Sequence, residues 1–141
     1  MCLKNTCRKP SKTTSNRQTG KIKVHHMWLA VDPGLAIQPT NVLAQLEGAA
    51  VFGLSVALLE ELTIQNGAPV QSYFHDYQVL RMSEMPEIHT KLVQSDAAPT
   101  GMGEIGVLPV APAIANAIFQ LTGKRLRSLP MSPQRVKSAL T

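Results

Sequence analysis

Aromatic and charged residues are scarce in this chain of 141 residues. Aromatics make up 4% of the sequence and charged residues 16%, whereas 44% of the residues are apolar. Such a composition excludes a disordered protein and predicts one domain whose core is packed from aliphatic and small side chains. The longest apolar run, 48–59, is shorter than a membrane span, and no apolar stretch follows the basic N-terminus. We therefore expect no membrane association and a cytoplasmic location.

Cysteine is almost absent as well. Cys2 and Cys7 are the two cysteines, and both lie near the N-terminus. Their C-x4-C spacing has no second pair to complete a zinc site, and it fits no ferredoxin pattern. The sequence therefore excludes a disulfide scaffold, and we predict two reduced thiols and no metal ligands. No P-loop or dinucleotide-binding fingerprint is present either.

Acidic residues are missing from both ends of the chain. The formal net charge is +5, yet all nine acidic residues lie within 21–123, between two basic ends. Residues 1–19 are rich in Ser, Thr and Lys without a hydrophobic period, which predicts a disordered basic leader before a domain over 20–141. A nucleic-acid-binding module would need its bases on one folded face with aromatics interleaved, so it is the least favoured function.

Strand-like and helix-like segments alternate along the rest of the chain. The patterns predict strands over 21–31 and 87–93, a hairpin turn at Asn66–Gly67, and helices over 40–61, 110–122 and 133–139. Thr40 or Asn41 would cap the first helix, which is apolar on nearly every side and should be buried. The predicted fold class is α+β, with a small mixed sheet, one buried central helix and a second C-terminal helix.

A stripe of small residues follows Gln45 on the first predicted helix. Ala49, Gly53 and Ala57 recur every four residues, so they share one helix face with Gln45. Glycine inside a helix costs about 1 kcal/mol relative to alanine. Close approach of another backbone or of a ligand to this stripe would explain why Gly53 is tolerated there.

Few residues are candidates for chemistry. Neither His25 and His26, which face opposite sides of a strand, nor the lone His89 can form a metal site by itself. His75 and Asp76 are adjacent, and adjacent side chains rarely point at each other. Glu104 differs, because it lies in a glycine-bordered loop, 100–106, just before a predicted helix. Its carboxylate could serve a site there, or it could make structural hydrogen bonds at the helix entry.

Three segments in a fixed order carry a family resemblance. They are Gln45-Leu46-Glu47-Gly48-Ala49, the stretch Phe74 to Met82, and Gly103-Glu104-Ile105-Gly106 followed by 109–117. Together they resemble the C-terminal end of the molybdopterin-binding subunit of the xanthine dehydrogenase/aldehyde oxidase family, in its isoquinoline 1-oxidoreductase beta-subunit branch. The resemblance runs from about residue 20 to residue 140.

This resemblance implies roles for particular residues. Glu104 matches the family's catalytic base, Gln45 matches the glutamine that contacts the pterin, and Gly103 lets the loop approach the cofactor. The implied activity is oxidation of aldehydes or N-heterocycles with oxygen derived from water. Many relatives have proline after the glutamate, and Ile105 in its place would loosen the loop.

The resemblance also implies that further polypeptide is needed. The chain would be a fragment or split piece of a molybdenum hydroxylase that works with the remainder of the molybdenum subunit and a 2Fe–2S subunit. The isolated chain would not retain the molybdopterin-type cofactor and would be inactive. An inactive truncated remnant is the alternative.

Overall fold

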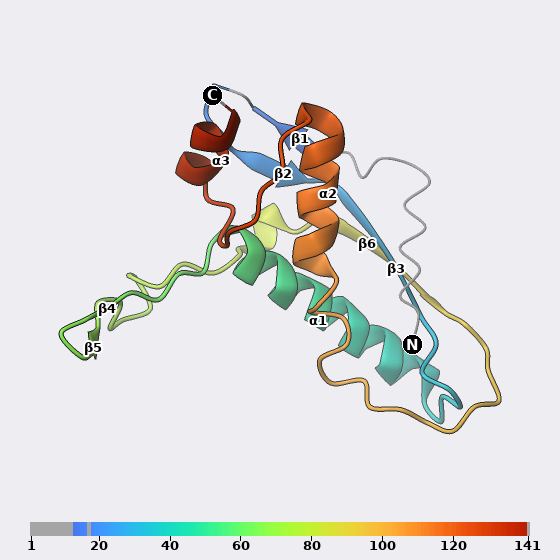
Figure 1. The fold of residues 1–141 in the computed structure, drawn as a ribbon. Helices are drawn as coiled ribbons and strands as arrows, with labels where there is room; N and C mark the ends of the chain where they lie inside the picture. Colours follow the sequence, from blue (N-terminus) through green and yellow to red (C-terminus); the bar gives the residue numbers. More distant parts are fainter. Residues whose placement is uncertain (1–12, 17, 141) are drawn as a thin grey trace.

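The described part of the chain is built around a strand–helix–strand unit. The computed structural model describes residues 13–16 and 18–140. Strand β3 (His26–Val31) is followed by helix α1 (Pro39–Leu58), and strand β6 (Glu87–Leu92) then pairs with β3 in parallel, with His26 opposite Glu87 and Trp28 opposite His89. Parallel pairing needs a crossover, and α1 lies along one face of the two strands (Figure 1).

Two further sheets, each of two strands, complete the β-structure of the described residues. β1 (Thr13–Ser15) pairs with β2 (Ile22–Val24), and β4 (Ile64–Gln65) pairs with β5 (Ala68–Pro69), both antiparallel. β1 lies inside the segment predicted to be a disordered leader, so the residues 13–15 belong to the fold. Residues 1–12 and 17, with both cysteines, lie outside the described residues, and the boundary at residue 19 stays a prediction.

Helix α1 begins earlier than predicted and is less buried. Pro39 starts it, because proline presets the helical φ and lacks an N–H that would be unsatisfied at a helix start. Thr40 and Asn41 therefore lie inside the first turn, and the predicted cap is wrong. The helix buries only one side, and Phe52 on the other side is 65% exposed.

Length and apolar composition would allow α1 to cross a membrane. The expectation of no membrane association rests on the apolar run 48–59 alone, which is too short for a membrane span. The whole helix is long and apolar enough, because its first turns contain few charges. However, 44% of the apolar window of α1 is buried inside the protein, and the core helices of globular proteins pass the same test. The helix therefore gives only weak support for a membrane location.

Close packing of α1 against α2 (Val110–Thr122) confirms the prediction for the small-residue stripe. A Cβ built on Gly53 would lie 2.8 Å from both the Val107 carbonyl oxygen and Val110 Cγ2. The glycine thus lets the start of α2 approach the α1 backbone. One core cluster forms here from buried side chains of β2, α1, α2, α3 (Pro133–Leu140) and the segment just before α3: Ile22, Val24, Leu54, Ala57, Val110, Ile114, Ile118, Met131 and Val136.

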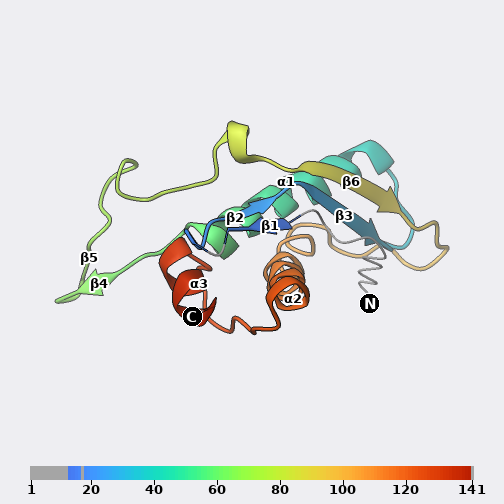
Figure 2. The same cartoon turned by 90° about the horizontal axis from the view of Figure 1, so that it is seen from above.

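The segment 62–81 extends away from the helices as an arm that carries β4 and β5 at its far end (Figures 1 and 2). Asn66 and Gly67 both have positive φ, 50° and 80°, as the predicted hairpin turn requires. The 3-10 turn Met82–Glu84 then leads the chain back to β6.

The α+β class is confirmed, together with its central helix and the helices that follow. The single mixed sheet is replaced by one parallel and two antiparallel pairs. A second core cluster joins β3 to α1 and to the loop before α2, through Leu29, Val31, Leu46, Ala50 and Ile105. This cluster holds the loop that carries Glu104.

Candidate functional site

Gln45 and the glycine loop meet in the folded chain. Gln45 lies on an exposed face of α1, and its Nε2 donates a hydrogen bond to the Gly103 carbonyl oxygen at 3.0 Å. The two residues are 58 positions apart in sequence. The structure therefore brings together Gln45, Gly103 and the adjacent Glu104.

The loop is anchored on the side that follows Glu104. Ile105 is only 6% exposed and packs in the second core cluster. A Cβ on Gly106 would lie 2.8 Å from Ala49 Cβ, so the loop backbone rests directly on α1. The Val107 N–H also donates to the Glu104 carbonyl oxygen at 3.0 Å. The Ile105 side chain therefore anchors the loop in the core, and the comparison with proline at this position stays a prediction.

The other side of the loop is open. Glu104 is exposed, and a Cβ built on Gly101 or Gly103 would meet nothing within 4 Å. Neither of these glycines has a positive φ, so their value here is free space rather than an unusual backbone conformation. A carboxylate, a side-chain amide and a bare stretch of backbone thus share one accessible surface.

A pterin-type cofactor fits the chemistry of this surface. Within the described chain, Gln45 uses one amide hydrogen on Gly103, and no protein group occupies its second amide hydrogen or its oxygen. An amide offers donors and acceptors to a pterin edge or to phosphates, and the glycines leave room beside it. Glu104 presents an exposed carboxylate next to that room.

A cavity of the described residues lies elsewhere. Its volume is about 260 Å³, and residues of β2, the C-terminal half of α1, the 3-10 turn and the start of α3 line it. Neither Gln45 nor Glu104 contributes to that lining. This cavity is therefore separate from the surface that Gln45 and Glu104 share.

Two histidines that the sequence analysis set aside, His75 and His89, make contacts that it did not predict. His75 Nε2 lies 2.9 Å from Asp76 Oδ1, so these adjacent side chains do point at each other, although the His75 side chain is 77% exposed. His89 does not stand alone: it stacks on Trp28 and lies 3.4 Å from Glu87. The register of β3 against β6 creates this second group, which sequence reasoning missed.

The basic C-terminal segment makes contacts within the chain. The Arg125 guanidinium lies 3.9 Å from the centre of the Phe119 ring, and Arg135 pairs with Glu61 at 2.5 Å. These two arginines therefore help to fix the connection after α2 and the helix α3.

Comparison with known proteins identifies the family. Residues 11–86 match the family described as molybdopterin cofactor-binding domain. The chain therefore belongs to the molybdopterin cofactor-binding domain family, and the resemblance to the xanthine dehydrogenase/aldehyde oxidase family is confirmed. The matched region includes Gln45 and ends before Glu104.

Individual relatives agree with this family. The chain is 48% identical over 118 residues to the isoquinoline 1-oxidoreductase subunit beta of Brevundimonas diminuta, covering 84% of this chain and 15% of that protein. It is 40% identical over 125 residues to a membrane-bound aldehyde dehydrogenase (pyrroloquinoline-quinone) of Gluconacetobacter polyoxogenes, covering 89% and 16%. This chain thus spans about a sixth of the length of these relatives.

A solved structure shows the same fold. The aldehyde oxidoreductase of Desulfovibrio gigas superimposes with a TM-score of 0.78 at 24% identity, over 91% of this chain and 14% of that one. This likeness supports the arrangement of α1, the parallel strands and α2 as an established one.

Proposed function

We propose that this chain supplies one wall of a molybdenum hydroxylase site, with Glu104 as the catalytic base and Gln45 and Gly103 as cofactor contacts. The hydrogen bond from Gln45 Nε2 to the Gly103 carbonyl oxygen is the observation that carries this proposal. It joins two motifs far apart in sequence and leaves the Glu104 carboxylate exposed beside them.

Each residue has a distinct task in this proposal. Gln45 orients the cofactor with its remaining amide groups, and it also holds the loop through Gly103. Glu104 accepts a proton at a carboxylate oxygen, which requires the carboxylate to lie within hydrogen-bond reach of its donor. Ile105 positions Glu104 by anchoring the loop in the core. The bound cofactor supplies the oxidising metal centre.

Further polypeptide completes the site in this proposal. The surface around Gln45 and Glu104 is open, and relatives of about sixfold greater length carry the same domain. We propose the remainder of a molybdenum subunit and a 2Fe–2S subunit as partners, and aldehydes or N-heterocycles as substrates. The isolated chain would then be inactive and would not retain the cofactor.

Two substitutions test these roles in the complex of this chain with the polypeptide that completes the site. Glu104→Gln keeps the size of the side chain but removes the base, so turnover should fall at least about a hundredfold with molybdenum content unchanged. Gln45→Ala should lower molybdenum content instead, because a cofactor contact is lost. Metal analysis and steady-state kinetics on the same preparations measure both effects.

Glu84→Gln is the matched control, since Glu84 is an exposed glutamate of the 3-10 turn, away from the glycine loop. It should leave turnover and molybdenum content unchanged. Near-normal turnover in the Glu104→Gln enzyme would refute the base role. Unchanged molybdenum content in the Gln45→Ala enzyme would refute the cofactor contact.

A further inference from the structure

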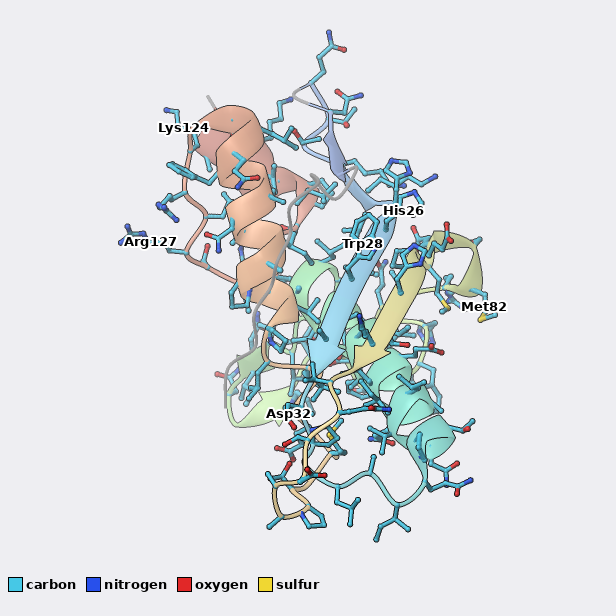
Figure 3. All side chains as sticks on the ribbon, turned by 90° about the vertical axis from the view of Figure 1, so that its right-hand side faces the viewer. His26, Trp28, Asp32, Met82, Lys124 and Arg127 are labelled. Atoms are coloured by element: carbon cyan, nitrogen blue, oxygen red, sulfur yellow. The ribbon has the colours of Figure 1, made fainter. Side chains whose placement is uncertain are left out.

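Four side chains with rings or carboxylates share one face of the β3–β6 pair. His26 lies opposite Glu87, and Trp28 lies opposite His89, in the parallel register. Side chains two residues apart on a strand project from the same face, as His26 and Trp28 do in Figure 3, so all four lie together. Leu29 and Val31 point the other way, into the core cluster with α1. The group is therefore separated from Gln45 and Glu104 by the sheet itself.

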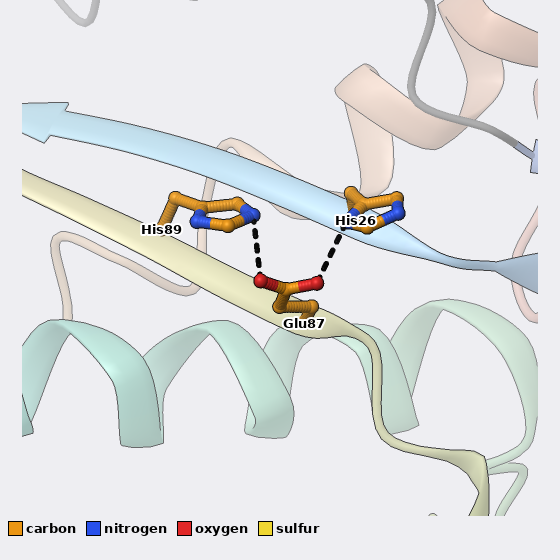
Figure 4. A group of neighbouring side chains, drawn as sticks. All are labelled: His26, Glu87 and His89. Carbon is orange, nitrogen blue, oxygen red and sulfur yellow. Dashed lines mark ion pairs between the residues drawn. The ribbon is translucent and has the colours of Figure 1, made fainter.

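The two imidazoles converge on one carboxylate (Figure 4). His26 Nδ1 lies 3.2 Å from Glu87 Oε2, and His89 Nε2 lies 3.4 Å from Glu87 Oε1. One ligand atom from each of the three residues can be chosen so that all lie within 4.8 Å of one another. Ligands of a tetrahedral zinc ion, each about 2.1 Å from the metal, are about 3.4 Å apart. The two nitrogen–oxygen separations are close to this value, and small side-chain movements would bring all three groups around one ion.

The contact between His26 and Glu87 does not satisfy the imidazole. His26 Nδ1 is within ion-pair distance of the carboxylate, yet it is shielded from solvent and makes no aligned hydrogen bond. Buried polar atoms without such a partner are uncommon in folded proteins. A cation between the nitrogen and the carboxylate would satisfy both groups.

Stacking holds the imidazoles in place. The Trp28 ring lies 5.5 Å from the His26 ring and 5.2 Å from the His89 ring, and the two imidazoles lie 5.9 Å apart, with interplanar angles of 24° or less. Both histidines stand on paired strands, which are more rigid than loops. The donor set is thus largely arranged before any ion binds.

We propose that His26, Glu87 and His89 form a binding site for a divalent transition metal ion, with Zn²⁺ as the preferred ion. Two imidazoles and one carboxylate are an established donor set for zinc, which takes a fourth ligand from solvent. Glu87 is 63% exposed, so a water molecule can reach the ion from that side. The described residues contain this one group of three potential ligands within reach of a single ion.

Titration with ZnCl₂ tests the proposal on the full 141-residue chain. The protein is purified without a polyhistidine tag and carries Cys2→Ser and Cys7→Ser, so that thiols do not compete for the metal. Calorimetry should show one equivalent of bound Zn²⁺. His26→Ala and His89→Ala should each weaken binding at least about tenfold, because each removes a ligand. His75→Ala, which removes an exposed imidazole of the arm, is the control and should bind as the parent does.

Trp28 provides a second measurement. It is the only tryptophan in the sequence, and its ring stacks on both histidines. Cu²⁺, which binds such sites more tightly than Zn²⁺, should quench more than half of the tryptophan emission at one equivalent. Quenching in the His89→Ala variant should need at least about tenfold more copper.

Glu87→Gln keeps the shape of the carboxylate and the ring stack while it removes the charged ligand, so it decides the matter if an alanine variant does not fold. Circular dichroism verifies folding of every variant. Equal affinity in the parent, His89→Ala and Glu87→Gln proteins would overturn the proposal and leave the rings as a cross-strand packing contact. Absence of Zn²⁺ binding by the folded parent chain would overturn it as well.

Discussion

The Tyr77 side chain links the arm to the end of α1. Its hydroxyl donates a hydrogen bond to Glu60 Oε2 at 2.8 Å, and the nearby Leu80 N–H donates to the buried Ser55 Oγ at 3.0 Å. The hydrogen bond to the Glu60 carboxylate, with smaller contributions from desolvation and from the carboxylate charge, raises the pKa of Tyr77 above 10.0. Two polar contacts thus fix the base of a segment that otherwise extends away from the core.

The raised pKa gives a prediction at high pH. A Tyr77 pKa that is higher in the folded than in the unfolded chain means that its contribution to stability is complete below pH 10 and is lost as the pH rises through the folded-state value. In a Tyr73→Phe background, Tyr77 is the remaining tyrosine, and its absorbance at 295 nm should titrate with a midpoint above 10. Adding Glu60→Gln should lower that midpoint, and an unchanged midpoint would contradict the role of the carboxylate.

Local sequence signals predict the backbone conformation of individual residues well, but they do not predict contacts between residues far apart in sequence. Asn66–Gly67 forms the predicted turn because both residues tolerate positive φ without help from the rest of the chain. The pairing of His26 and His89 with Glu87 depends on the β3–β6 register, which no local pattern encodes. Gln45 and Glu104 were found through motifs whose order resembles a family, although their meeting through Gly103 was visible only in the structure.

Among the elements, α1 is the one that both clusters of the core share. Its sequence is apolar on nearly every side, and that pattern could not tell which face this chain covers. Burial follows the face that meets α2 and the strands, whereas Phe52 remains exposed. The helix boundaries of α2 were easier to predict, because Gly123 ends the helix in the left-handed conformation.

Two glycines of α1 should respond to alanine in opposite ways. Gly48→Ala meets nothing within 4 Å, so the gain in helix propensity should raise the free energy of unfolding by up to about 1 kcal/mol. Gly53→Ala places a Cβ 2.8 Å from the Val107 carbonyl oxygen. The resulting overpacking should lower the free energy of unfolding by about 1–3 kcal/mol. Urea unfolding of the two variants provides the comparison, and stabilisation by Gly53→Ala would show that α2 can shift away.

At the scale of the whole molecule, large apolar side chains are exposed on the arm, in the 3-10 turn that follows it and just before α1. Phe74 is fully exposed, Met82 is 85% exposed and Ile37 is 84% exposed. Monomeric proteins seldom leave extended apolar surface in water, and relatives that contain this domain are several times longer. Further polypeptide covering these side chains would account for both observations.

The isolated chain should therefore bind a dye that detects apolar surface. Phe74→Ser and Met82→Ser together should reduce the fluorescence of bound 8-anilinonaphthalene-1-sulfonate, because two exposed apolar groups are removed. The far-ultraviolet circular dichroism should not change, since neither side chain packs in a core cluster. Dye fluorescence equal to that of the parent would show that Phe74 and Met82 are not part of the apolar surface detected.

The parallel pairing of β3 with β6 also constrains the order of folding. β3 ends at Val31 and β6 begins at Glu87, so the strands can join only after α1 and the whole arm have been synthesised. Loop-closure entropy opposes such distant pairing, and folds that rely on it form slowly. During translation β3 therefore emerges with its hydrogen-bonding edge unmatched, and a nascent chain that stalls before Glu87 should be a substrate for chaperones.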